Sequence, residues 1–132
     1  MKRRCVIVDD SPALLRAASA LLGSEGLDVV GVAGGIDEAV RVVEEHTPDL
    51  VLVDIDLGVE SGFDLTRRLA AALERTGACS ILISTHDEAD YTTLILASPA
   101  IGFLPKAELS AAAIARLANG HHEGGSAEPE GM

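Results

Sequence analysis

The sequence predicts an α/β fold, a (βα)5 arrangement in which a doubly wound parallel sheet of five strands is covered by helices on both faces. Five short aliphatic runs alternate along the chain with five stretches of helical periodicity, which is the pattern of repeated strand–helix units. Hydrophobic residues make up 48% of the chain and aromatic residues only 2%. A core of valine, leucine, isoleucine and alanine suits parallel strands that are buried on both faces.

The predicted strands are short runs of β-branched and aliphatic residues, bounded by polar residues, glycine or proline. Right-handed crossovers between them predict the strand order 2-1-3-4-5, the usual order of a doubly wound sheet of this size. In chain order the strands are CVIVD at 5–9, LDVVGVA at 27–33, LVLVD at 50–54, SILIS at 80–84 and IGFLP at 101–105.

The predicted helices have apolar residues on one face and start or stop signals at their ends. Ser11 precedes Pro12 at the start of the first helix, and Gly23 is expected to end it. The stretch 88–97 has the weakest pattern because it is partly β-branched. In chain order the helices are 12–22, 37–46 ending before Pro48, 62–75 beginning after Ser61, 88–97, and 111–118 between Ser110 and Asn119-Gly120.

Charge and length limit the classes of function. The chain has 132 residues, the size of one domain, and its formal net charge is −11. An acidic chain without a long cluster of lysine and arginine disfavours direct contact with nucleic acid or an anionic membrane. No apolar run reaches the roughly 18–20 residues that cross a bilayer, so we expect a cytoplasmic protein. Cys5 and Cys79 lack the spacing of a zinc site or a disulfide framework.

Polar residues stand where the predicted strands end. Asp9 and Asp10 follow the first strand, Asp54 ends the third, Ser84 ends the fourth and Lys106 follows the fifth. In a doubly wound sheet these carboxyl ends meet at one edge, and ligands bind there at the switch point between the first and third strands. We therefore expect these five side chains to line one cleft.

The chemistry of this cleft points to phosphoryl transfer. Three carboxylates repel one another at neutral pH unless a cation lies among them, and oxygen ligands with free water positions favour Mg²⁺. We expect Asp54 to place one oxygen on the metal and to attack phosphorus with the other, while Lys106 supplies a second positive charge. Ser84 is expected to hydrogen-bond an oxygen of the phosphoryl group.

Residues 4–118 resemble the response-regulator receiver domain of two-component signalling, a CheY-like domain of flavodoxin-like fold, and in particular the receivers of NarL/FixJ-type regulators. The motifs VIVDDSP, LVLVDIDLGVESGFDL, ILIST and GFLPK, in this order, carry the resemblance. It implies that Asp54 accepts a phosphoryl group from a sensor histidine kinase or a phosphotransfer protein. Such a domain is not an enzyme with turnover; it assists its own phosphorylation and its slow autodephosphorylation.

The resemblance assigns a role to each residue of the acidic cleft. Asp10 and Asp54 are expected to bind Mg²⁺ directly, and Asp9 is expected to bind it through water. Asp56 is expected to offer its backbone carbonyl as the third protein ligand. Lys106 occupies the position of the family's lysine.

The resemblance also implies a switch and its tuning. Ser84 is at the family's hydroxyl position and moves toward the phosphoryl group, while Phe103 is at the position of the rotating aromatic residue. The side chains of Asp56, Thr85 and His86 are at positions that tune the rate of autodephosphorylation. The switch is expected to remodel the surface formed by 88–97, 101–105 and 111–118 and so to control an output protein or domain. A homodimer through the same surface is a further expectation.

Two departures from the family's pattern concern the backbone. Gly58 stands where proline is frequent, which is expected to loosen that loop. Ala107 replaces the proline that usually follows the lysine. The cis bond of the family would therefore have to form at a non-proline peptide, at a cost of about 2.5–4 kcal/mol.

The resemblance divides the chain into a receiver domain at 1–118 and a tail at 119–132. The tail is expected to be a disordered, acidic segment or the remnant of a linker, because it is polar and rich in glycine. Two alternatives stay open: a single-domain regulator, or an excised receiver of a transcription regulator.

Other functions are compatible with some of the same residues. A phosphatase of the haloacid-dehalogenase type also has a strand followed by Asp-x-Asp, with Asp54 as nucleophile and Asp56 as general acid and base. In that family the Asp-x-Asp strand comes first, whereas here the acidic pair precedes it. A pseudo-receiver that never takes phosphate would lack an acidic position or the lysine, and none of these is missing here. A nucleotide-binding flavodoxin-like protein would have a loop rich in glycine, serine or threonine after the first strand, where this chain has Asp9-Asp10-Ser11-Pro12.

Overall fold

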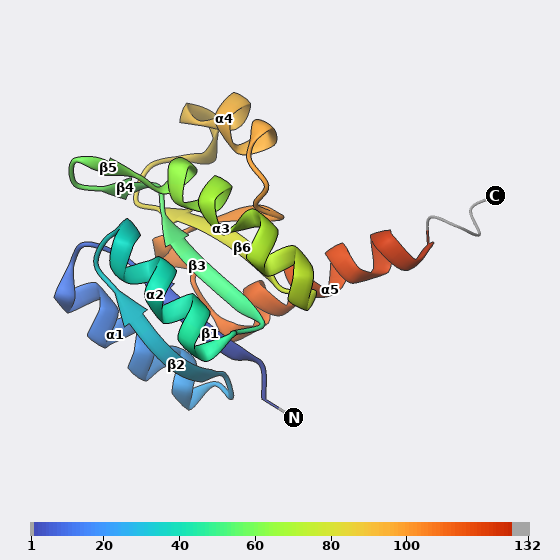
Figure 1. Cartoon of the computed structure of the whole chain (residues 1–132), viewed down its shortest axis with the longest axis horizontal. Coiled ribbons are helices and arrows are strands. Elements are labelled where there is room, and N and C mark those ends of the chain that lie inside the picture. Colours follow the sequence, from blue (N-terminus) through green and yellow to red (C-terminus); the bar gives the residue numbers. More distant parts are fainter. Residues whose placement is uncertain (1, 128–132) are drawn as a thin grey trace.

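The computed structural model describes residues 2–127, and it contains the predicted parallel sheet (Figure 1). Five strands lie in the order β2-β1-β3-β6-β7, and every neighbouring pair is parallel. This is the predicted order 2-1-3-4-5, because the labels β4 and β5 belong to a separate hairpin. The strands of the sheet are β1 (Arg4–Val8), β2 (Asp28–Ala33), β3 (Leu50–Asp54), β6 (Cys79–Ser84) and β7 (Gly102–Pro105).

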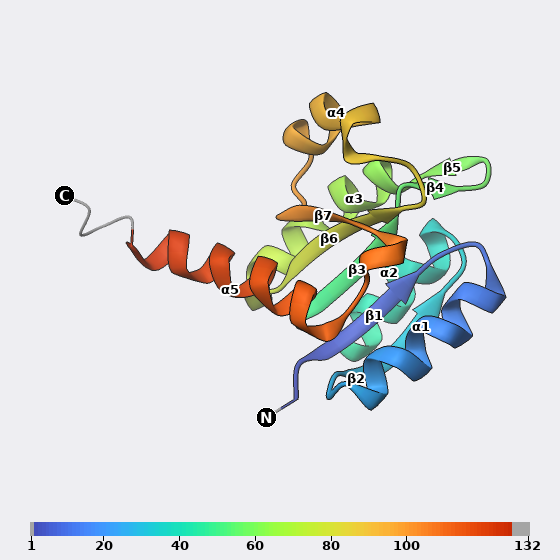
Figure 2. The same cartoon turned by 180° about the vertical axis from the view of Figure 1, so that it is seen from behind.

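Helices cover both faces of this sheet, as Figures 1 and 2 show from opposite sides. One face packs against α1 and α5, and the other packs against α2 and α3, with the short α4 beside the far end of that face. The helices are α1 (Pro12–Ser24), α2 (Ile36–His46), α3 (Gly62–Thr76), α4 (Thr92–Ala97) and α5 (Ala111–Ala127), with 3-10 turns η1 (Glu88–Asp90) and η2 (Lys106–Glu108).

The central strand β3 shows how the sequence builds two cores. Successive side chains of a strand point to opposite faces of the sheet. Val51 and Val53 accordingly join the cluster under α2 and α3, whereas Leu50 and Leu52 join the cluster under α1 and α5. All five residues of β3 are buried, so the aliphatic run ends in an aspartate that the sheet holds in place.

Several predicted boundaries differ from the structure. Gly23 does not end α1, which continues to Ser24 and closes through the amide of Glu25, while the following Gly26 takes a φ of +102°. The predicted helix 88–97 is divided into η1 and α4. Its β-branched residues and lack of capping side chains explain why the helical stretch is short.

The last helix is longer than predicted. Asn119 and Gly120 do not form a left-handed cap, and α5 continues to Ala127, so its final turns extend beyond the sheet (Figure 1). Glycine permits a left-handed cap without requiring one. The expected disorder of 119–132 therefore does not describe 119–127, and the remainder of the tail lies outside the described residues.

A small antiparallel hairpin, which the sequence did not predict, follows β3. It consists of β4 (Asp56–Leu57) and β5 (Glu60–Ser61), with Gly58 at its turn in the left-handed region at φ +77°. The hairpin stands beside the carboxyl end of the sheet, between β3 and α3 (Figure 1).

Candidate functional site

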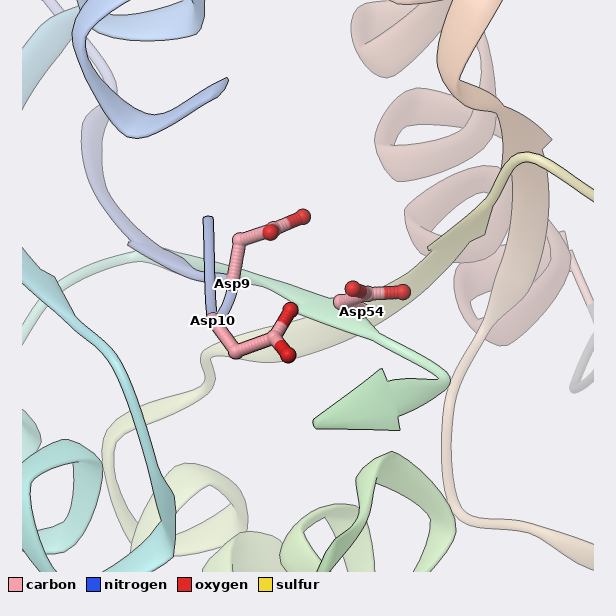
Figure 3. Close-up of side chains that lie close together, drawn as sticks. All are labelled: Asp9, Asp10 and Asp54. Atoms are coloured by element: carbon pink, nitrogen blue, oxygen red, sulfur yellow. The ribbon is translucent and has the colours of Figure 1, made fainter. Parts of the chain in front are cut away.

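Three carboxylates gather at the carboxyl ends of β1 and β3, as the sequence predicts. Asp9 and Asp10 directly follow β1, and Asp54 is the last residue of β3. The two strands are neighbours with Val8 opposite Val53, so their ends lie at one edge. One carboxylate oxygen of each aspartate lies within 4.8 Å of those of the other two. In Figure 3 the carboxylates of Asp10 and Asp54 extend into the same space, with Asp9 beside them.

Lys106 neutralises part of this negative charge. Its Nζ lies 2.7 Å from Oδ2 of Asp9 and 3.1 Å from Oδ2 of Asp54, where it donates a hydrogen bond. Asp9 is fully buried and Asp54 is 4% exposed, so little water competes for these contacts. The lysine therefore holds the two carboxylates of different strands together.

The acidity of Asp54 reflects this environment. The pKa of its carboxyl is raised to about 6: burial is the largest cause and the Asp9 carboxylate acts in the same direction, whereas the Asp56 amide and Lys106 oppose the rise. For Lys106, partial burial lowers the pKa, but the hydrogen bonds and charges of Asp9 and Asp54 outweigh this effect and raise it. Asp54 is thus mostly ionised at pH 7 beside a fully charged lysine.

The cluster fits a divalent cation. Among the described residues, Oδ2 of Asp9 is buried without a hydrogen-bond donor in suitable geometry, although Lys106 is close enough for an ion pair. Its other oxygen, Oδ1, accepts a hydrogen bond of 2.8 Å from the amide of Ser11. Lys106 forms ion pairs with two of the three carboxylates, so a cation among them would balance the negative charge that remains. Hard oxygen ligands of this kind suit Mg²⁺.

The backbone after β3 approaches Asp54 closely. The amide of Asp56 donates to Oδ1 of Asp54 at 3.1 Å, and Gly62 donates to the carbonyl of Ile55 at 2.8 Å. A Cβ on Gly62 would lie 2.1 Å from the backbone oxygen of Asp54, so no larger residue fits there. Ser61 caps α3 as predicted, accepting from the amide of Phe63 at 3.1 Å.

Gly62 and Glu60 are two residues near the site that were not predicted from the sequence. A glycine directly after a capping serine is the signal that could have indicated a close backbone approach. No sequence pattern indicates the contact of Glu60, since its partner, the amide of Ile36, lies 24 residues earlier in the chain.

The predicted switch residues lie on the two strands farther from β1. Ser84 is 3% exposed at the end of β6, beside β3, and its Oγ accepts a hydrogen bond of 2.9 Å from the amide of His86. Phe103 is 8% exposed on β7, opposite Leu82. Both side chains are therefore covered by protein, and their motion stays a prediction.

The predicted tuning residues are on the surface. Thr85 and His86 are exposed, and so is the side chain of Asp56, which accepts from the amide of Gly58 at 3.2 Å. Tyr91 stands between His86 and Phe63, with ring centroids 6.0 Å and 6.1 Å from theirs. The residues after β6 thus connect to the first turn of α3 through Tyr91.

The peptide after Lys106 is trans, since the residues that the structure describes contain no cis bond.

Within the same residues, none of the helices combines the length and apolar character needed to cross a membrane.

Comparison with known proteins gives one consistent family. Residues 5–118 match the family described as response regulator receiver domain. The transcriptional activator protein ExaE of Pseudomonas putida is 36% identical, over 88% of this chain and 55% of that protein. The protein-glutamate methylesterase/protein-glutamine glutaminase of Haloarcula marismortui is 35% identical, over 78% of this chain and 28% of that protein. The crystal structure of a LuxR-family two-component response regulator from Aurantimonas sp. SI85-9A1 has a TM-score of 0.77 and 27% identity, over 90% of this chain and 87% of that one.

This chain spans about half of the activator and less than a third of the methylesterase. The similarity therefore concerns the part that these proteins share with this chain and not the activities in their names.

Proposed function

This chain belongs to the response regulator receiver domain family, and on that premise we propose that Asp54 accepts a phosphoryl group from a phosphorylated histidine of a sensor kinase or phosphotransfer protein. The observation that carries the proposal is the buried carboxylate of Asp54, held by Lys106 at 3.1 Å among two further aspartates. A carboxylate in this setting is both an anionic nucleophile and a metal ligand.

The transfer itself needs only positioning and charge. A carboxylate oxygen of Asp54 attacks the phosphorus of phosphohistidine, a new O–P bond forms and the N–P bond breaks. The imidazole leaves with the electron pair of that bond and takes up a proton. Lys106 balances the added negative charge, and the Ser84 hydroxyl donates to a phosphoryl oxygen.

Receiver domains bind Mg²⁺ at an acidic pocket, and we assign that pocket to Asp10 and Asp54 as direct ligands, Asp9 through water and the backbone carbonyl of Asp56. When bound, Mg²⁺ neutralises charge on the transferring phosphoryl group. Among the described residues, three carboxylates gather within 4.8 Å and only two of them are ion-paired with Lys106, which supports this assignment.

The proposed output is a change of surface. Ser84 leaves the amide of His86 for the phosphoryl group, Phe103 moves into the vacated space, and the surface of α4, β7 and α5 changes. The exposed leucines of α4, Leu94 and Leu96, support a contact there with an output protein or domain, or with a second copy of the chain. A cytoplasmic setting is part of the proposal, in keeping with two free cysteines.

Intact-mass measurement after incubation with acetyl phosphate and Mg²⁺ tests the proposal. We expect the mass of one phosphoryl group, no gain in Asp54→Asn, and no gain with a chelator. Asp56→Asn is the matched control, since it keeps the backbone carbonyl and should still be labelled. Loss of labelling in Asp56→Asn together with turnover of a phosphate ester by the unaltered protein would favour the phosphatase, and absence of labelling with every donor would favour a pseudo-receiver.

A further inference from the structure

Glu60 of the β4–β5 hairpin reaches across to the start of α2. Its Oε1 accepts a hydrogen bond of 2.9 Å from the amide of Ile36, the first residue of that helix. The N-cap residue Gly35 has no side chain to satisfy this amide, so the cap comes from a distant part of the chain. A carboxylate at this place also complements the positive end of the helix.

The loop that receives Glu60 borders the acidic cluster. Gly35 leaves room for the carboxylate, because a Cβ on Gly35 would lie 3.0 Å from its Oε1. A Cβ on Gly34 would lie 3.9 Å from the backbone oxygen of Asp9, and the Asp9 amide donates to the carbonyl of Ala33 at 3.0 Å. The loop at 33–35 is thus fixed to Asp9 on one side and to Glu60 on the other.

The hairpin that carries Glu60 also carries Asp56. Glu60 is paired with Leu57, and Asp56 is paired with Ser61 and donates to Oδ1 of Asp54. The turn between the two strands contains Gly58 in the left-handed region and the fully exposed Val59. Val59 anchors nothing; Leu57 anchors one strand of the hairpin in the core, and the contact of Glu60 with the amide of Ile36 ties the other strand to α2.

We propose that Glu60 is a positioning residue of the metal site. By tying the hairpin to α2, it holds the backbone carbonyl of Asp56 beside Asp54 and Asp10, where the cation binds. The inference rests on the proposed function, because it takes the carbonyl of Asp56 as a ligand. Glu60 itself touches neither the cation nor the phosphoryl group.

Mg²⁺ affinity of the unphosphorylated protein, measured by titration calorimetry, tests this role. We expect Glu60→Ala to bind Mg²⁺ roughly tenfold more weakly, the low end of the effect of outer partners of metal ligands. Glu60→Gln keeps an acceptor oxygen and should restore most of the affinity. The NMR signal of the Ile36 amide should shift in Glu60→Ala and stay close to its original position in Glu60→Gln.

Glu38→Ala is the matched control. Glu38 lies on the same helix turn, but its carboxylate accepts from the amide of Gly34 at 2.8 Å, whereas that of Glu60 accepts from the amide of Ile36. Its removal takes away one carboxylate and one capping bond, and it should leave the Mg²⁺ affinity within about twofold because salt screens such exposed charges.

Equal weakening in Glu60→Ala and Glu38→Ala would overturn the inference, since charge alone would then explain both. Unchanged affinity in Glu60→Ala would overturn it as well. Failure of the proposed function is distinguishable, because then the unaltered protein would neither bind Mg²⁺ nor take label from acetyl phosphate.

Discussion

The acidic cluster and the α4 region differ in how firmly the chain holds them. At the acidic cluster, Asp9 and Asp54 are buried and share the ion pairs of Lys106. In the α4 region, residues 85–90 are all exposed, and of the six residues of α4 only Ile95 is buried. Phosphoryl transfer needs groups fixed in advance, whereas a change of surface needs a segment with few contacts to break. The acidic cluster has the fixed groups, and the α4 region has the segment with few contacts.

The largest expected effect is on the free energy of unfolding, and it compares a residue of the sheet with a residue of α4. Leu52 is fully buried in the central strand, so Leu52→Ala should lower the free energy of unfolding by about 2–5 kcal/mol. Leu96 is 80% exposed on α4, and Leu96→Ala should change it by less than about 0.5 kcal/mol. Urea denaturation of both variants measures the two values. Similar losses would mean that α4 is packed as firmly as the sheet.

The second largest effect is expected from removal of the positively charged side chain of Lys106. Lys106→Ala leaves the carboxylates of Asp9 and Asp54 without their ion pair and should slow labelling by acetyl phosphate roughly hundredfold, as for other single electrostatic groups in transfer reactions. The time course of intact mass at saturating Mg²⁺ gives the rate. A rate close to that of the unaltered protein would contradict the role of Lys106.

The third effect concerns pH in the presence of a chelator. The pKa of Asp54 is raised from 3.8 to about 6 in the folded protein, so between about pH 4 and pH 6 the native state binds more protons than the unfolded state. The contribution of Asp54 to the free energy of unfolding therefore falls as the pH rises through this window. Asp54→Asn removes the ionising group and should stabilise the metal-free protein at pH 7.5 by about 1–3 kcal/mol.

The same substitution should have a much smaller effect on stability at about pH 3, below the unfolded-state pKa of 3.8, where Asp54 is mostly protonated in both states of the unaltered protein. Thermal denaturation at the two pH values compares them. Stabilisation of equal size at both would show that the effect comes from hydrogen bonding and not from burial of charge.

The smallest effect concerns access to the site from the α4 side. Thr85 is exposed and directly follows the buried Ser84. We expect Thr85→Ala to admit water more freely and to speed the loss of label about twofold to fivefold, a barrier change of less than about 1 kcal/mol. Label remaining after removal of free acetyl phosphate measures it. Slower loss in the variant would show that the threonine assists hydrolysis.

The sheet order and the acidic cluster could be predicted from the sequence because both follow from parallel strands. Once LVLVD and CVIVD are neighbours in register, Asp54 and the pair Asp9-Asp10 must lie at one edge. Lys106 could be predicted in the same way, as the residue after the last strand. Periodicity and strand order suffice for such features.

The parts that could not be predicted depend on contacts across the chain. The hairpin has only two residues in each strand, too few for a periodicity, and Glu60 finds its partner on a different helix. The close approach of Gly62 to Asp54 is a matter of backbone packing. The length of α5 depends on whether Gly120 takes a left-handed or a right-handed helical conformation. Glycine can adopt both, so the sequence does not decide between a helix that ends at Gly120 and one that continues past it.

The scarcity of aromatic residues has a spectroscopic consequence. The chain contains one tyrosine and no tryptophan, and that tyrosine, Tyr91, packs near Phe63 and His86 at the start of α4. Intrinsic fluorescence and the tyrosine band of near-ultraviolet circular dichroism therefore come from a single position in the whole molecule. Without any label, a change in either signal upon phosphorylation reports directly on the α4 region.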